Sequence, residues 1–172
     1  RYVIIVVHTN HIVVEEAAMD CTFNTPEGKF NLRVGAVITD GNRVLVGKDS
    51  RVDFYTVIGG RVKLGETAEA AVLREIREET GVSAETDRLY SISEKFFRFD
   101  GIAYHELEFL FLIKPFDISL IDDSAIQCDG ADQQLVWLDS TKDPDMPVFP
   151  KHLFEAVNSP APELRFITEN ES

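Results

Sequence analysis

One segment of this chain, residues 67–80, has the composition and the ends of an α-helix, whereas most other segments resemble β-strands. It is rich in Ala, Glu and Arg, contains no Pro, and is followed by Gly81, a residue typical of helix ends. The strand-like segments cover residues 2–7, 12–15, 32–38, 43–46, 54–58, 94–99, 106–113 and 135–138, with a second short helix expected at 151–157. A helix that interrupts a series of strands predicts an α+β domain, in which helices cover a mixed β-sheet as an α/β/α sandwich.

Length, charge and cysteine content limit the classes of function. The 172 residues suit one domain, and 30 acidic against 17 basic residues give a net charge of −13. Because nucleic acids and anionic membranes attract basic surfaces, we expect neither as a partner. Cys21 and Cys128 are far apart and outside any metal-binding spacing, which predicts a reduced, cytoplasmic protein.

The predicted helix carries three carboxylates on one side. At about 100° per residue, Glu75, Glu78 and Glu79 fall within an arc of about 100°. Carboxylates without His or Cys are the ligands of hard divalent cations, above all Mg²⁺. The helix alone also fits a simpler interpretation, a solvated face on which glutamates pair with arginines.

The spacing around these glutamates decides between the two interpretations. Residues 60–82 read Gly, five residues, Glu, seven residues, then Arg-Glu-aliphatic-x-Glu-Glu-x-Gly-aliphatic. This pattern resembles the signature box of the Nudix hydrolases of MutT type at every fixed position. The resemblance implies the α/β/α sandwich of that family, with a domain at residues 31–157. It leaves residues 1–30 as an N-terminal extension containing a hairpin, and residues 158–172 as a C-terminal tail.

The resemblance also implies roles for individual residues. Glu78 and Glu79 correspond to the principal metal ligands, Glu75 to a further ligand or the catalytic base, and the carbonyl of Gly59 to another ligand. Arg74 corresponds to the residue that orients the glutamates, so Glu75, Glu79 and Arg74 form the expected catalytic set. Further acids are expected among the loop residue Glu66 and the strand residues Glu106 and Glu108. By strand alternation Glu106 and Glu108 share one face, and the alternative is that both face solvent on an edge strand.

The implied reaction is Mg²⁺-assisted hydrolysis, with Mn²⁺ as a substitute, of a nucleoside diphosphate linked to another moiety. Water activated by the metal would attack phosphorus in the diphosphate bridge. The cations expected to bind the substrate phosphates are Arg51, Arg61, Lys63 and Arg98. A different class of function is a nucleotide-sensing Nudix domain without turnover. Exchange of residues 1–18 between two copies would give a homodimer.

Overall fold

The computed structural model of the protein describes residues 3–8, 11–16, 18–121 and 133–170. Its strands are β1 (Val3–His8), β2 (His11–Glu16), β3 (Thr22–Thr25), β4 (Gly28–Val37), β5 (Thr39–Asp40), β6 (Arg43–Asp49), β7 (Tyr55–Arg61), β8 (Thr86–Phe99), β9 (Ile102–Ile113), β10 (Gln133–Asp139), β11 (Val148–Phe149) and β12 (Arg165–Asn170). Its helices are α1 (Ala68–Thr80), the 3₁₀ turn η1 (Ile118–Leu120) and α2 (Leu153–Asn158).

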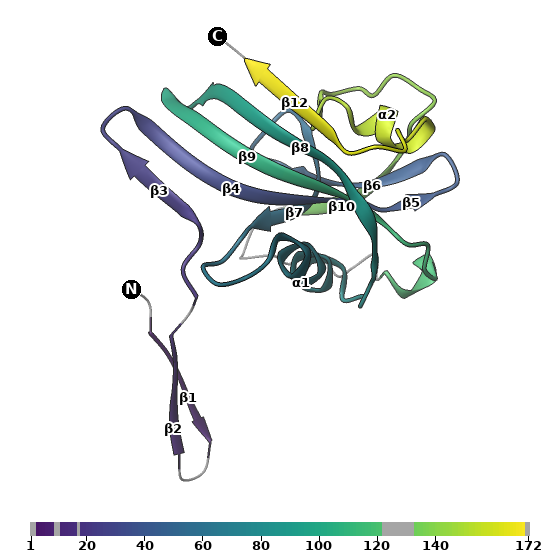
Figure 1. Ribbon diagram of the computed structural model, residues 1–172. Coiled ribbons are helices and arrows are strands. Elements are labelled where there is room, and N and C mark those ends of the chain that lie inside the picture. Colours follow the sequence, from purple (N-terminus) through teal and green to yellow (C-terminus); the bar gives the residue numbers. More distant parts are fainter. Residues whose placement is uncertain (1–2, 9–10, 17, 122–132, 171–172) are drawn as a thin grey trace.

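The sheet of the domain is mixed, and the two α-helices lie on opposite sides of it (Figure 1). Its strand order is β10-β6-β7-β4-β9-β8-β12, with β3 added to β4, β5 to β6 and β11 to β7. The pairs β4–β9, β8–β12 and β7–β11 are parallel, whereas β4–β7 and β8–β9 are antiparallel. The predicted α+β sandwich with a mixed sheet is therefore confirmed.

Helix α1 begins and ends where the sequence predicts. The Thr67 hydroxyl accepts a hydrogen bond from the Ala70 N–H at 3.1 Å, which satisfies one of the unpaired donors of the first turn. Gly81 ends the helix with φ of 74°, and its N–H donates to the Arg77 carbonyl at 3.0 Å. A left-handed residue at this position strongly favours glycine.

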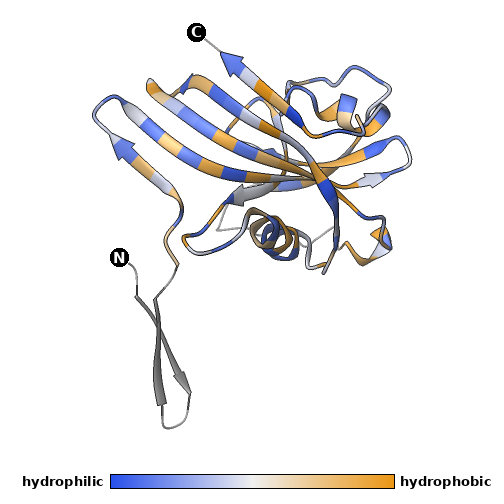
Figure 2. Ribbon diagram, in the orientation of Figure 1, coloured by the Kyte–Doolittle hydropathy of each residue, from blue (hydrophilic) through white to orange (hydrophobic). Residues whose placement is uncertain are grey.

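Side chains alternate along the strands and so build two cores, one on each side of the sheet. Figure 2 shows this alternation as hydrophobic and hydrophilic bands along the strands. The core on the side of α1, here called the α1 face, includes Val34, Ala36, Ile58, Val72 and Ile76. The core on the side of α2, here called the α2 face, includes Val37, Val57, Leu110, Leu153 and Ala156. The sheet thus separates the two helices and fixes which strand residues each can meet.

Strand β8 and two additional strands differ from the sequence-based expectation, whereas the N-terminal hairpin agrees with it. Strand β8 starts at Thr86 instead of residue 94, with irregular pairing near both Asp87 and Tyr90 that interrupts its alternation. Strands β3 and β12, from the segments expected to lie outside the domain, pair with β4 and β8. The predicted N-terminal hairpin is present, since β1 pairs with β2 in a separate two-stranded sheet.

Residues 122–132, Cys128 among them, lie outside the described residues. Over the described ranges, no helix is both long and apolar enough to cross a membrane.

Candidate active site

Two adjacent glycines bring the end of β7 against helix α1. A Cβ on Gly60 would overlap the carboxylate of Glu75, and a Cβ on Gly59 would overlap the carbonyl oxygen of Val34. Gly59 also has φ of 154°, which L side chains rarely adopt. The absence of side chains here therefore lets the helix carboxylates approach the sheet backbone.

Arg74 connects the glutamates of the loop and the helix. Its Nε and Nη2 donate to the two carboxylate oxygens of Glu66 at 2.8 and 3.0 Å. Its Nη1 donates to Glu75 Oε1 at 2.7 Å and to Glu78 Oε2 at 3.0 Å. Its Nη2 also donates to the Arg61 carbonyl at 3.0 Å. One guanidinium thus holds three carboxylates and the end of β7 in place.

The loop glutamate is held on its other side by the backbone. The Lys63 N–H donates to Glu66 Oε2 at 3.0 Å. The hydrogen bond from Arg74 holds the pKa of the Glu66 carboxyl below its usual range. Glu66 is therefore charged and fixed by Arg74 and the loop.

Glu79 is the most deeply buried of the three helix carboxylates, with 7% of its surface exposed. Its Oε1 accepts a hydrogen bond from the Gly59 N–H at 3.2 Å. Burial nevertheless raises the pKa of Glu79 to about 8, against the opposing influence of that hydrogen bond and of Arg33. Burial also raises the pKa of Glu75, and the hydrogen bond from Arg74 opposes this rise. A further positive charge would therefore favour the ionised form of both carboxyls.

This burial gives a prediction for stability against pH. We expect the free energy of unfolding of the metal-free protein to fall as pH rises from about 4.5 to about 8, because folded Glu79 keeps a proton that the unfolded chain loses at its ordinary pKa of 4.5. Urea unfolding in EDTA at pH 5, 6.5 and 8 would measure this slope. Glu79→Gln should reduce the slope, and equal slopes in parent and variant would contradict the assignment.

A hard divalent cation suits the carboxylates of Glu75, Glu78 and Glu79 and the carbonyl of Gly59, because carboxylate and carbonyl oxygens are the ligands that Mg²⁺ prefers. The raised pKa of buried Glu79 agrees with a need for positive charge there. In the part of the chain that the structure describes, no three carboxylate, imidazole or thiol groups already converge on a metal position. Instead, Arg74 Nη1 bridges Glu75 and Glu78 as a positively charged donor.

The expected further acids Glu106 and Glu108 do not face solvent on an edge strand, because β9 lies between β4 and β8. Both are buried on the α2 face, at 7% and 5% exposure. Lys95 Nζ lies 2.6 Å from Glu108 Oε2 and 3.6 Å from Glu106 Oε1. The Asn31 amide donates to Glu106 Oε2 at 3.3 Å. The prediction that Glu106 and Glu108 share one face is confirmed. The alternative that both face solvent is wrong, because both are buried on the α2 face, where Lys95 compensates their charges.

The four cations expected to bind phosphate are scattered. Arg51 follows β6 at the end of β7 opposite to Gly60, and its Nε donates to Asp49 Oδ1 at 2.8 Å. Arg98 lies on β8, three strands across from Gly60 and six residues, about 20 Å, farther along, and it donates to the Gly101 carbonyl at 3.2 Å. Only Arg61 and Lys63 adjoin the loop before α1.

Sequence reasoning missed Arg33, whose charge opposes the rise that burial causes in the pKa of Glu75 and of Glu79. Arg33 comes from β4 and has no place in the Nudix spacing. Its position became visible only through the pairing of β4 with β7.

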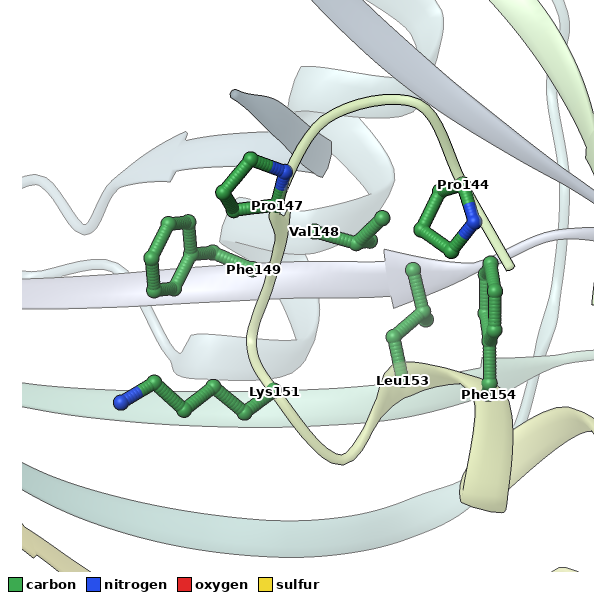
Figure 3. A pocket seen from close by; sticks show the side chains of 7 residues that line it. All are labelled: Pro144, Pro147, Val148, Phe149, Lys151, Leu153 and Phe154. Carbon is green, nitrogen blue, oxygen red and sulfur yellow. The ribbon is translucent and has the colours of Figure 1, made fainter. Parts of the chain in front are cut away.

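The structure also has a pocket of about 280 Å³ away from these residues (Figure 3). It lies at the start of β7, where β11 pairs with Tyr55 and Thr56. Its lining is almost entirely apolar: Pro144, Pro147, Val148, Phe149, Lys151, Leu153 and Phe154. The carboxylates at the other end of β7 do not contribute to it.

Comparison with known proteins agrees with the architecture and with the residue pattern. A family model of the NUDIX domain matches residues 29–152, well over half of the chain. The chain therefore belongs to the Nudix hydrolase family.

Among curated proteins, the chain is similar to NudC, an NAD-capped RNA hydrolase from Vibrio atlanticus (strain LGP32), with 37% identity over 86 residues. That match covers 48% of this chain and only 31% of the relative's length.

Two solved structures show the same fold. A MutT protein from Bacillus halodurans has a TM-score of 0.64 at 20% identity, covering 83% of this chain and 90% of that one. A MutT NUDIX hydrolase from Burkholderia pseudomallei has a TM-score of 0.60 at 22% identity, covering 76% and 98%. At these identities the likeness extends to the fold alone.

Proposed function

We propose that the protein is a Mg²⁺-dependent hydrolase that cleaves the diphosphate linkage of a nucleoside diphosphate joined to another moiety. The observation that carries this proposal is the arrangement around Arg74, which holds Glu66, Glu75 and Glu78 beside buried Glu79 and the glycine pair. These residues belong to the Nudix box, and a carboxylate cluster next to a glycine turn suits metal-bound phosphate chemistry.

In this proposal Glu78, Glu79 and the Gly59 carbonyl would hold the cation, with Glu75 beside them. When bound, Mg²⁺ would neutralise the bridging oxygens and lower the pKa of a water molecule. Glu75 would act as the general base for the attacking water, since its side chain is 14% exposed and burial raises its pKa. Arg74 keeps Glu75 and Glu78 oriented, and Glu66 keeps Arg74 in place.

The test is a substrate panel with Mg²⁺, Mn²⁺ or EDTA. The panel contains dinucleotides including NAD, sugar nucleotides, ADP-ribose, nucleoside triphosphates and a capped RNA. We expect a nucleoside monophosphate, pyrophosphate or phosphate to be released from at least one small nucleotide, and no release in EDTA. Restoration by Mg²⁺ after EDTA would exclude simple loss of the fold.

The panel also distinguishes small-nucleotide substrates from RNA, and calorimetry distinguishes a hydrolase from a nucleotide-sensing domain. NAD and capped RNA are included because the relative NudC acts on NAD-capped RNA, whereas the net charge of −13 favours small substrates over RNA. Tight nucleotide binding in calorimetry without product after long incubation would favour the sensing domain and contradict the hydrolase. The cytoplasmic location and the exchange of residues 1–18 in a homodimer stay predictions.

A further inference from the structure

Two arginines lie directly opposite each other at the end of the β4–β7 pairing, close to the glycine pair before the box loop. Arg33 of β4 pairs in register with Arg61 of β7, two residues along the strands from the pair of Gly35 and Gly59. Directly opposite residues of antiparallel strands share one face, here the α2 face, with Cβ atoms about 5 Å apart. Like charges in this position repel each other and destabilise the pair of strands. Such an arrangement calls for an anion between or beside them.

The protein itself supplies little compensation for these two charges. The Arg61 Nη1 lies 3.5 Å from Asp20 Oδ2, a long ion pair, and the Arg61 Nε is buried without a hydrogen-bond acceptor. Half-buried Arg33 makes no hydrogen bond or ion pair with any residue that the structure describes, and its electrostatic neighbours are Glu75 and Glu79. A buried donor without an acceptor is costly and rare in folded proteins. Both guanidiniums therefore have donors left for a ligand.

The acid nearest to Arg33 on the neighbouring strand is already used. Glu108 of β9 is in register with Arg33 on the α2 face. Its Oε2 binds the Lys95 ammonium at 2.6 Å, so much of its charge is compensated from β8. Lys95 thus limits the attraction of Glu108 for Arg33.

The arginine pair is tied to the box through the backbone. Arg74, which binds Glu75 and Glu78, also donates to the Arg61 carbonyl, and Glu79 accepts from Gly59 two residues earlier. We propose that Arg33 and Arg61 form a phosphate-binding pair that holds a phosphate group of the substrate next to the box. Planar guanidiniums with free donors match phosphate oxygens in geometry and charge. That the phosphate belongs to a nucleoside diphosphate derivative rests on the proposed function.

The test is a calorimetric titration of inorganic pyrophosphate at saturating Mg²⁺ into the parent protein and into Arg33→Ala, Arg61→Ala and Arg98→Ala. Loss of a charge-assisted hydrogen bond should raise the Kd about tenfold or more for Arg33→Ala and for Arg61→Ala. Arg98→Ala, about 20 Å farther along the strands, serves as the matched control and should leave the Kd unchanged. The proposed phosphate-binding pair would be contradicted if the parent did not bind pyrophosphate, if Arg33→Ala left the Kd unchanged, or if Arg98→Ala raised the Kd equally.

Mn²⁺ affinity and the thermal midpoint of Arg33→Ala distinguish phosphate binding from a counter-charge role and from a purely structural role. If Arg33 were only a counter-charge for Glu75 and Glu79, Arg33→Ala would change the affinity for Mn²⁺ alone and leave the pyrophosphate Kd unchanged. If it were only structural, its removal would lower the thermal midpoint, whereas relief of repulsion with Arg61 predicts an unchanged or higher midpoint. Failure of the substrate panel would contradict the hydrolase, while the titration would still decide whether the arginines bind phosphate.

Discussion

Replacing Glu78 by glutamine is expected to reduce hydrolysis by about 10³-fold or more while leaving the protein folded. Loss of a charged ligand of the proposed cation should remove several kcal/mol of transition-state stabilisation, and each 1.36 kcal/mol is a factor of ten. The fold should survive because the Glu78 side chain is 49% exposed and its ion pair with Arg74 is one of several that Arg74 makes. The kcat/KM on the best substrate of the panel, together with circular dichroism, measures both effects.

Glu69→Gln is the matched control for this prediction. Glu69 lies in the first turn of the same helix, is exposed, and bonds Thr86 instead of Arg74. We expect it to keep at least half of the parent activity. A Glu78→Gln protein as active as the parent would show that the metal lies elsewhere.

Replacing Arg74 by alanine is expected to lower the free energy of unfolding by about 3 kcal/mol. Removing one partner of a buried ion pair costs about 3–5 kcal/mol, and the lower value applies because Arg74 retains 20% exposure. The carboxylates of Glu66 and Glu75, 16% and 14% exposed, would lose the guanidinium that compensates them. Urea unfolding at pH 7.5 measures the loss.

Two variants sharpen this second prediction. Arg77→Ala changes an exposed arginine of the same helix and should alter stability by less than about 0.5 kcal/mol. Arg74→Lys should recover only part of the loss, because an ammonium cannot reproduce the paired hydrogen bonds to Glu66. Equal effects of Arg74→Ala and Arg77→Ala would mean that Arg74 does not stabilise the loop before α1.

The helix and its carboxylates could be predicted from the sequence because their causes are local. Thr67 and Gly81 terminate α1 through contacts within three or four residues. The arc of Glu75, Glu78 and Glu79 follows from helical geometry alone. Strand β12 was not predicted, because a segment of six residues gives only a weak indication of a strand. Its strand conformation depends on pairing with the edge of the sheet formed by β8.

The surroundings of those carboxylates depend on which strands become neighbours. The bond between Asn31 and Glu106 spans 75 residues, and it exists because β4 pairs in parallel with β9. The same pairing puts Glu106 and Glu108 inside the sheet, where Lys95 compensates them.

By itself, then, the sequence determined the Nudix box, the helix that carries its glutamates and the need for positive charge beside them. Tertiary structure alone decided that one nitrogen of Arg74 bonds both Glu75 and Glu78, that Glu79 is buried against Gly59, and that Arg33 faces Arg61. The physical reason is the separation along the chain over which each interaction acts. Helix periodicity and capping act over a few residues, whereas burial, strand register and the pKa values that follow from them depend on groups far apart along the chain.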